Sequence, residues 1–207
     1  MHRARDLSRY AVECIGASIE PGMTAADASE LALRVLADLS AERSWHPVIV
    51  RFGEDTLRVF REPPSPSSVL AKNDIYFVDI GPVWDGHEGD AGDTFVVGGD
   101  PDMLACASAV RTLWNDVREA WRHGASGREL YAWAARQARA SGWTLNLDIR
   151  GHRVSDFPHA IHHGGKLGDF DGSPQAGLWV LEMQIAHPER PFGAFFEELL
   201  STDERSP

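Results

Sequence analysis

Cysteine is scarce in this chain: Cys14 and Cys106 are the only two among 207 residues, and their spacing is not that of a metal site. A disulfide framework or a zinc ribbon is therefore not expected, and we interpret both thiols as buried and inert. Long apolar runs are also missing, since no stretch approaches the roughly 18–20 residues of a membrane span. The first residues lack the apolar region and cleavage site of a signal peptide. Together these absences predict a cytoplasmic protein that does not bind membranes.

Basic residues are in the minority, because 20 Lys and Arg face 31 Asp and Glu, which gives a formal net charge of −11. A protein that binds nucleic acid needs a basic face to neutralise phosphates, so this balance argues against nucleic acid as a partner. An excess of carboxylates suits divalent cations, although most such charge is ordinary solvated surface. Nothing in the sequence demands a homodimer, which stays an open alternative.

Apolar spacing predicts a mixture of helices and strands. Helices are expected over about 3–18, after Thr24, over about 102–122 and after Ser126. Strands are expected at 46–53, 56–60, 75–84, 94–99, 145–149, 178–186 and 193–200. The repeated order of two helices followed by strands indicates an α+β domain over residues 1–207 with two similar halves. Residues 1–20 would hold the N-terminal helix, and residues 203–207 a frayed tail.

Carboxylates recur where the pattern otherwise indicates buried sheet. The stretch VDIGPVWDGHEGDAGDTF, residues 78–95, puts Asp79 and Asp90 eleven residues apart on the two arms of an expected hairpin. Two buried carboxylates repel each other, which raises the pKa of one of them unless a cation lies between them. A divalent metal would remove that repulsion, since hard cations prefer oxygen ligands. The alternative is that both residues are turn aspartates facing solvent.

Further side chains of the metal-binding type follow downstream. His152 and His159 come after an expected strand, and Glu182 lies inside another apolar strand. Glu182 is either buried with a partner or turned to solvent on an edge strand, because an unpaired buried carboxylate is costly. One of Glu197 and Glu198 should face inward. Two Asp, one His and two Glu at strand ends are what a dinuclear metal site needs.

The ordered set of these residues resembles the metal ligands of the methionine aminopeptidase, aminopeptidase P and creatinase family, the pita-bread metallohydrolases. VDIGPVWDGHEGDAGDTFVVG is similar to the D-x-G … D-x-x-x-T-F-x-x-G hairpin of that family. GHRVSDFPH is similar to its G-H-x-x-G-x-x-x-H segment, with Ser155 where glycine is usual. GLWVLEMQI resembles G-M-V-x-x-x-E-P with one residue fewer before the glutamate. GAFFEELLST resembles the closing strand and favours Glu197 over Glu198 as a ligand.

The resemblance extends over residues 20–202 and implies the pita-bread fold. That fold has two α+β halves related by a pseudo-twofold axis, with a curved antiparallel sheet and flanking helices. The resemblance also implies a ligand set for two divalent ions, which would be Mn, Fe, Co or Zn. Asp79 would bind one ion, His152 and Glu182 the other, and Asp90 and Glu197 would bridge them.

The same resemblance implies a catalytic scheme. A bridging hydroxide would attack an N-terminal peptide bond or a small amide. Glu182 would accept a proton, and His159 would stabilise the carbonyl oxygen and contact the substrate. The implied partner is thus a small peptide or another small molecule.

On the substrate side the chain departs from the family pattern. Its aminopeptidases have a further histidine about eighteen residues before the first metal aspartate, where this chain has Arg61, a residue suited to clamping a carboxylate. His46 could replace that histidine in space, but we interpret it as a loop residue. Trp45, Trp84 and Trp179 are interpreted as core aromatics, with Trp84 kept as a candidate for substrate binding.

Three functions stay open at this point. The first is dinuclear metal-dependent hydrolysis by a short family member without the N-terminal domain of proline-specific relatives. The second is a repurposed member that acts on a non-peptide C–N bond or uses iron for oxidative chemistry. The third is a metal-free binding protein on the same fold. The intact five-ligand set favours the first, although a fold by itself never fixes a reaction.

Overall fold

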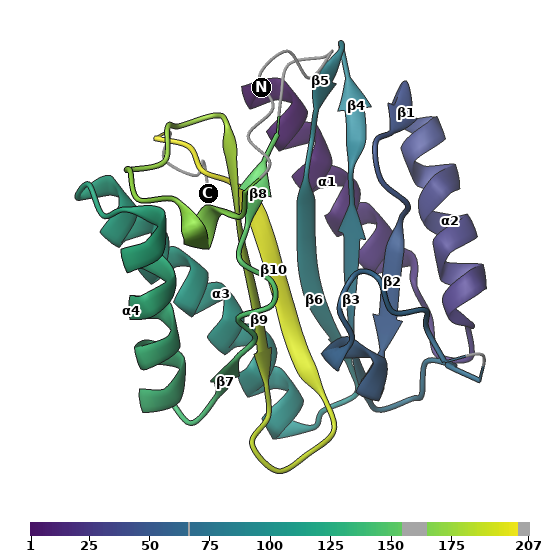
Figure 1. Ribbon diagram of the computed structural model, residues 1–207. Coiled ribbons are helices and arrows are strands. Elements are labelled where there is room, and N and C mark those ends of the chain that lie inside the picture. The colour runs from purple at the N-terminus through teal and green to yellow at the C-terminus, as the bar shows by residue number, and fades with distance from the viewer. Residues whose placement is uncertain (66, 155–164, 203–207) are drawn as a thin grey trace.

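The computed structural model describes residues 1–65, 67–154 and 165–202 (Figure 1). Its helices are α1 (His2–Ser18), α2 (Ala25–Asp38), α3 (Pro101–Arg122) and α4 (Gly127–Ala140), with 3-10 turns η1 (Gly53–Leu57) and η2 (Leu167–Asp169). Its strands are β1 (Arg43–Ser44), β2 (Ile49–Phe52), β3 (Asp74–Ile80), β4 (Pro82–Trp84), β5 (His87–Glu88), β6 (Ala91–Val97), β7 (Thr144–Leu145), β8 (His152–Arg153), β9 (Trp179–Ala186) and β10 (Gly193–Leu199). In the described residues, none of these helices combines the length and hydropathy that a bilayer crossing needs.

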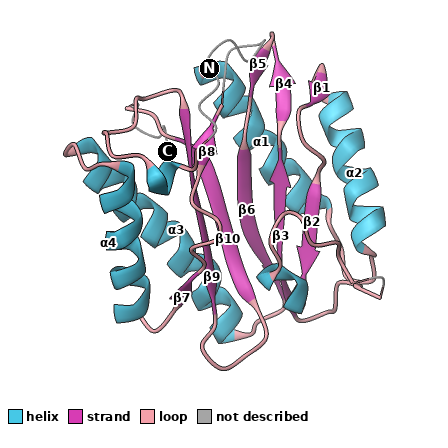
Figure 2. Ribbon diagram, viewed as in Figure 1, coloured by secondary structure: helices cyan, strands magenta, loops and turns pink. Residues whose placement is uncertain are grey.

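One large antiparallel sheet runs through the molecule in the order β2-β3-β6-β10-β9-β7, and β8 also pairs with β9. A smaller sheet has the order β1-β4-β5. Figure 2 shows the helices on one face of the large sheet. There α1 and α2 pack on β3, β6 and β2, while α3 and α4 pack on β9, β10 and β7. The α+β prediction is confirmed. The four described helices leave the opposite face of the large sheet uncovered.

Two of the helices begin where the local sequence predicts. Thr24 accepts a hydrogen bond from the Asp27 backbone, and the Asp27 side chain accepts one in return, so α2 starts with a capping box. Ser126 and Glu129 form the same reciprocal arrangement at the start of α4. Each box satisfies backbone N–H groups that a helix start otherwise leaves without partners.

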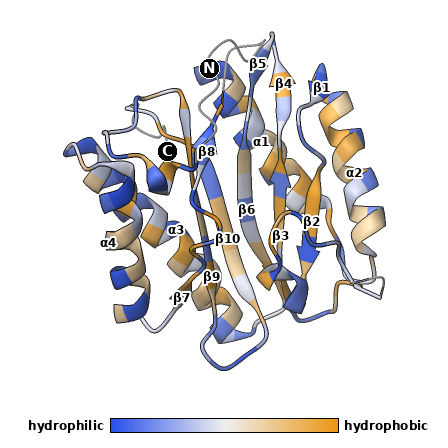
Figure 3. Ribbon diagram, viewed as in Figure 1, coloured by the Kyte–Doolittle hydropathy of each residue, from blue (hydrophilic) through white to orange (hydrophobic). Residues whose placement is uncertain are grey.

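Two hydrophobic cores lie between the sheet and the helices, one in each half. The first joins α1 and α2 to β2, β3 and β6, and includes Ile15, Leu36 and Val78. The second joins α3 and α4 to β9 and β10, and includes Trp114, Leu130 and Met183. The hydrophobic colouring of β2 and of parts of α2 marks the first core in Figure 3. Each half therefore buries apolar surface largely of its own.

The seam between the halves, which we define as the boundary of β6 and β10, is narrow. The strands pair at Gly92–Glu197 and at Ala91–Glu198. Further along, the Thr94 hydroxyl donates to the carbonyl of Phe195 at 2.7 Å and accepts from its N–H at 2.8 Å. A side chain thus substitutes for part of the strand ladder where the two halves meet.

The prediction of a strand at 56–60 is wrong, because the chain turns there into η1. Gly53 starts the turn with a φ of 51°, a conformation that glycine adopts readily. The Thr56 hydroxyl donates to the Gly53 carbonyl at 2.5 Å and accepts from the Gly193 N–H at 2.8 Å. The predicted strand at 145–149 is also shorter, since β7 ends at Leu145.

Candidate metal centre

A row of paired residues crosses the large sheet and builds the centre. Asp79 of β3 pairs with Gly92 of β6, Gly92 with Glu197 of β10, and Glu197 with Glu182 of β9. Side chains of directly paired residues lie on the same face of a sheet. The three carboxylates therefore project together, on the face opposite the helices, from strands of both halves.

Asp90 and His152 join this row from its two sides. Asp90 comes directly before β6 and lines the same cavity as the row. His152 of β8 pairs with Val180, which lies two residues before Glu182 on β9. The five side chains predicted as metal ligands, Asp79, Asp90, His152, Glu182 and Glu197, are in this way brought together from five segments.

Gly92 leaves the space in the middle of the row. A Cβ atom at this position would lie 2.6 Å from Cε1 of Phe195 and 3.2 Å from Cγ of Glu197. A larger residue would therefore displace the Glu197 side chain or the ring beneath it. The glycine is needed for close approach of the acids rather than for an unusual backbone conformation.

The acids and the histidine lie within ligand distance of one another. Nε2 of His152 is 2.9 Å from Oδ2 of Asp90 and 3.9 Å from Oε1 of Glu182. One ligand atom each from Asp90, His152 and Glu197 all lie within 4.8 Å of one another. Such a mixed set of carboxylates and imidazole suits a borderline divalent cation.

Several oxygens in this cluster are buried without a hydrogen-bond partner in the described residues. They include Oδ1 of Asp79, Oδ1 of Asp90 and Oε1 of Glu197. Buried carboxylate oxygens are normally paired, because desolvating a charge without compensation is costly. Cations at these oxygens would supply the missing partners, so the residues fit the metal ions that the resemblance implies.

The electrostatics of the acids reflect this crowding. Burial, reinforced by the charges of Asp79 and Asp90, holds the pKa of Glu197 well above its ordinary value. Burial also raises the pKa of Asp79 to about 6. Attraction to His46 lowers this pKa in part, and repulsion from Asp90 raises it. Burial acts on Asp90 too, but the neighbouring imidazoles of His152 and His46 outweigh it and lower the pKa of Asp90 to about 2. The cluster thus carries more negative charge than its own side chains can neutralise.

Glu182 is held by backbone and hydroxyl contacts. Its Oε2 accepts a hydrogen bond of 2.8 Å from the N–H of Gly151. Gly151 has a φ of 66°, and a Cβ there would lie 2.5 Å from the carbonyl oxygen of Val180. The Tyr131 hydroxyl of α4 donates to the carbonyl of Glu182 at 2.8 Å and accepts from its N–H at 3.2 Å. These contacts lie between the segments of β9 that pair with β8 and β7, so Tyr131 substitutes for a missing neighbouring strand.

A cavity of about 750 Å³ opens over the cluster. Besides the acids and histidines, its lining is rich in basic side chains: Arg51, Arg58, Arg61, Arg150, Arg153 and Lys166. Arg51 is 5% exposed, and its Nε has no hydrogen-bond partner within the described segments. A guanidinium of this kind can bind a carboxylate through two hydrogen bonds.

Of the described residues predicted to contact substrate, one lies at the cavity and one lies in the core. Arg61 lies in the lining of the cavity, and so does Trp45, contrary to the interpretation of Trp45 from the sequence as a core residue. Trp84, the candidate for substrate binding, is instead buried in the core of α1 and β3, where its Nε1 donates to the Ser8 hydroxyl at 3.1 Å. Trp179 is likewise buried in a core, as interpreted from the sequence. His159 lies outside the described residues.

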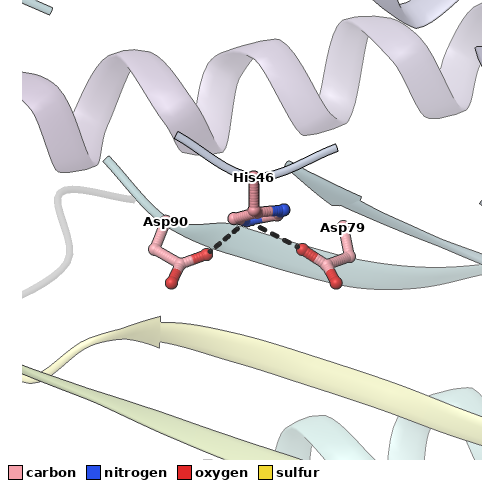
Figure 4. Close-up of side chains that lie close together, drawn as sticks. All are labelled: His46, Asp79 and Asp90. Carbon is pink, nitrogen blue, oxygen red and sulfur yellow. Dashed lines mark ion pairs between the residues drawn. The ribbon is translucent and has the colours of Figure 1, made fainter. Parts of the chain in front are cut away.

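Sequence reasoning missed the position of His46. It does lie in a loop, between β1 and β2, but its side chain points into the cluster between Asp79 and Asp90 (Figure 4). Attraction to these two carboxylates outweighs the effect of burial and raises the pKa of His46 to about 9. Pairing of β2 with β3 would have indicated this position, because Ile49 pairs with Asp79 and His46 is only three residues before Ile49.

A family model matches nearly the whole chain, and two curated proteins match half to three quarters of it. The model of metallopeptidase family M24 matches residues 1–197. Methionine aminopeptidase A of Synechocystis sp. is 33% identical over 111 residues, which is 51% of this chain and 43% of that protein. Methionine aminopeptidase 1 of Mycobacterium tuberculosis is 27% identical over 164 residues, 77% of this chain and 52% of that protein. The chain spans about half the length of these curated relatives.

A solved structure extends the comparison to the fold. The methionine aminopeptidase from Thermotoga maritima matches with a TM-score of 0.76 and 20% identity, over 98% of this chain and 92% of that one. At this level of identity the likeness concerns the fold alone. The expectation of a pita-bread fold is thereby confirmed.

Proposed function

The chain belongs to metallopeptidase family M24, and on that premise we propose that it is a dinuclear metal-dependent hydrolase that cleaves an N-terminal peptide bond or a related small amide. The observation that carries this proposal is the set of buried carboxylate oxygens of Asp79, Asp90 and Glu197 without hydrogen-bond partners in the described residues. Relatives named methionine aminopeptidases support the choice of a peptide bond.

The proposed ligand set divides the five side chains between two ions. Asp79 would hold one ion, His152 and Glu182 would hold the other, and Asp90 and Glu197 would contribute to both. When bound, divalent ions lower the pKa of water at the site and polarise the carbonyl of the substrate. Carboxylates combined with imidazole suit Mn, Fe, Co or Zn.

Glu182 is the residue that we assign to proton transfer. Its Oε2 is fixed by the Gly151 N–H, whereas Oε1 faces His152 at 3.9 Å. An oriented carboxylate beside the cavity can accept a proton from the attacking water at Oε1 and pass it to the leaving amine. His159 keeps its proposed role in stabilising the carbonyl oxygen.

The basic lining of the cavity supports a substrate that carries a carboxylate. Arg58 is paired with Asp55, and Arg150 with Asp169, so their charges are partly used within the protein. The guanidinium of Arg51 donates to the carbonyl of Glu62 but forms no ion pair within the described residues. We assign it, with Arg61 nearer the surface, to the anionic end of a short peptide or small amide acid.

Hydrolysis of short peptides by metal-loaded protein tests the proposed function. We expect turnover with at least one of Mn, Fe, Co and Zn, and a loss of about 100-fold or more in Asp90→Asn, because a shared ligand is removed. Asp116→Asn, at an exposed position of α3, is the matched control and should keep full activity. Protein that holds two ions and hydrolyses neither peptides nor small amides would contradict the proposal, and turnover that depends on iron and oxygen would favour the oxidative alternative.

The carboxylate preference has its own test. A dipeptide acid should be cleaved with a higher kcat/KM than its C-terminal amide, by about tenfold or more. Arg51→Gln should raise KM for the acid and leave the amide almost unchanged, while the exposed control Arg139→Gln changes neither. Equal rates for acid and amide in the unmodified protein would remove Arg51 from the substrate site without affecting the hydrolase proposal.

A further inference from the structure

His46 lies where a third protein ligand of one ion would lie. Its Nε2 is 3.5 Å from Oδ1 of Asp79 and 3.6 Å from Oδ1 of Asp90 (Figure 4). Ligand atoms of the three residues all lie within 4.8 Å of one another. The His46 side chain is 10% exposed, so the ring is directed inward rather than to solvent.

These separations fit ligands of a shared cation better than hydrogen bonds. An N–H···O hydrogen bond usually spans about 2.7–3.2 Å between heavy atoms. Two ligand atoms that each lie about 2.1 Å from one ion with tetrahedral angles are separated by about 3.4 Å. Both Oδ1 atoms facing His46 are buried and have no hydrogen-bond partner in the described part of the chain.

The other ring nitrogen of His46 favours the same role. Nδ1 is 2.8 Å from the carbonyl oxygen of Pro47, an acceptor that cannot donate. Nδ1 therefore carries the hydrogen of the neutral ring, and Nε2 keeps its lone pair toward the acids. A backbone carbonyl that orients a metal-binding histidine in this way is common around metal ions.

The loop that carries His46 is fixed against the site. The Trp45 N–H donates to the carbonyl of Gly81 at 2.8 Å, and its indole Nε1 donates to the carbonyl of Gly89 at 2.9 Å. A Cβ at Gly81 would lie 2.2 Å from Cδ2 of His46, so the glycine makes the room that the imidazole fills. Gly81 and Gly89 flank the hairpin between Asp79 and Asp90, which ties the ring to both acids.

We propose that His46 is a protein ligand of the ion held by Asp79 and Asp90, in addition to the five ligands of the proposed function, on whose dinuclear site this inference rests. Asp90 would then face one imidazole with each oxygen, His46 with Oδ1 and His152 with Oδ2. Each ion would have one nitrogen ligand. Such a pair of sites favours borderline ions such as Zn, Co and Fe over Mn, which prefers oxygen.

Metal titration of His46→Gln tests this assignment. The unmodified protein, the variant and the exposed control His123→Gln are each titrated with Co(II) and with Mn(II) by calorimetry, and the Co(II) absorption spectrum is recorded. We expect two ions per chain in the unmodified protein and in the control. In His46→Gln, the Co(II) affinity of one site should fall by about 100-fold with a change in its spectrum, while the Mn(II) affinity falls by less than about tenfold.

The difference between the two metals separates ligation from structural damage, since a distorted site would weaken both alike. Two Co(II) ions bound by His46→Gln with unchanged affinity and spectrum would overturn the proposal and leave the dinuclear site intact. Failure of the unmodified protein to bind Co(II) or Zn(II) would overturn both.

A measurement without substitution guards against a variant that does not fold. In protein labelled with ¹⁵N-histidine, addition of Zn(II) should shift the Nε2 resonances of both His46 and His152 in long-range ¹H–¹⁵N spectra. A shift confined to His152 would overturn the proposal, whatever the behaviour of the variant.

Discussion

Glu197 and Glu198 are neighbours on β10 and are almost equally buried, with 2% and 3% of each residue exposed, yet they lie in opposite surroundings. Glu198 faces the helices, where its carboxylate is 3.8 Å from Nε of Arg5 and 3.5 Å from Nε of Arg9. Glu197 faces the cavity, where its neighbours are the carboxylates of Asp79 and Asp90. One strand thus buries two adjacent acids, one beside cationic side chains and the other beside further carboxylates.

The difference shows how this fold separates stability from function. On the helix face, α1 supplies the arginines that balance Glu198, so the buried charge is part of the folded structure itself. On the cavity face, the four carboxylates of Asp79, Asp90, Glu182 and Glu197 meet from both halves, with the imidazoles of His46 and His152 between them. A face that concentrates buried acid in this way is suited to binding cations from solution, and it must bear their mutual repulsion until they bind.

The strongest test of the contrast is Glu197→Gln. The amide cannot bridge two ions, so the affinity for at least one Co(II) should fall by about 100-fold or more. In metal-free protein the same change removes repulsion with Asp79 and Asp90, and Tm should rise by about 3 °C. Calorimetric titration and thermal melting measure the two effects. A variant with lower metal-free Tm would contradict the idea that this acid is held against repulsion.

Glu198→Gln is the matched change on the other face and should do the reverse. It leaves Arg5 and Arg9 with less compensation, which should lower the free energy of unfolding by about 2 kcal/mol. Metal affinity should change by less than about threefold, because Glu198 does not face the ions. Urea unfolding and metal titration of the same preparation check both statements. A large loss of metal binding would mean that the two faces are coupled through β10.

The pH dependence of stability should sharpen the contrast further. In metal-free protein His46 and His152, with pKa values raised to about 9 and about 10 from an ordinary 6.5, stabilise the fold fully below pH 6.5. That stabilisation is lost as the pH rises through the folded values, and the raised pKa of Glu197 acts in the same direction above its ordinary 4.5.

Metal ions need deprotonated ligands, so their stabilising effect grows with pH. The Tm difference between protein with saturating Zn(II) and protein with chelator should therefore increase from about pH 6 to about pH 9. Differential scanning fluorimetry at several pH values checks this. A difference that does not change across the range would show that protons do not compete with the ions.

The smallest effect is expected for Tyr131→Phe, which removes the hydroxyl that pairs with both backbone groups of Glu182. Loss of these hydrogen bonds should cost about 1 kcal/mol of unfolding free energy. Metal affinity should fall by less than about tenfold, because the Gly151 N–H still holds the Glu182 carboxylate. Tyr10→Phe, at an exposed position of α1, is the control. Equal unfolding free energy and metal affinity in the two variants would show that the Tyr131 hydroxyl does not support the site.

Much of this arrangement is predictable from the sequence, because it depends on local signals. The capping boxes at Thr24 and Ser126 involve residues three apart, and both helices begin there. The hairpin that brings Asp79 and Asp90 to one site follows from two apolar arms separated by a turn, and the arms do pair. Alternation along β10 then separates Glu197 from Glu198. The resemblance to a known family supplied the order in which these segments meet.

The features that the sequence did not predict depend on contacts between distant residues. Residues 56–60 have the composition of a strand, but the Thr56 hydroxyl accepts from Gly193, and that partner is 137 residues away in the sequence. His46 enters the site because Gly81 leaves room for its ring. Trp84 turns to the helix side, where Ser8 accepts its N–H. In each case the local pattern permits more than one outcome, and tertiary packing selects among them.

The narrow seam between β6 and β10 has a consequence for cooperativity. Each half has its own hydrophobic core, and few backbone pairs tie β6 to β10, so the halves are candidates for separate unfolding units. Ions held between Asp90 of one half and Glu197 of the other would bind across this seam. With ions bound, the melting enthalpy should belong to a single transition, whereas chelated protein should melt in two steps. In this chain the bound ions would therefore also couple the unfolding of the two halves.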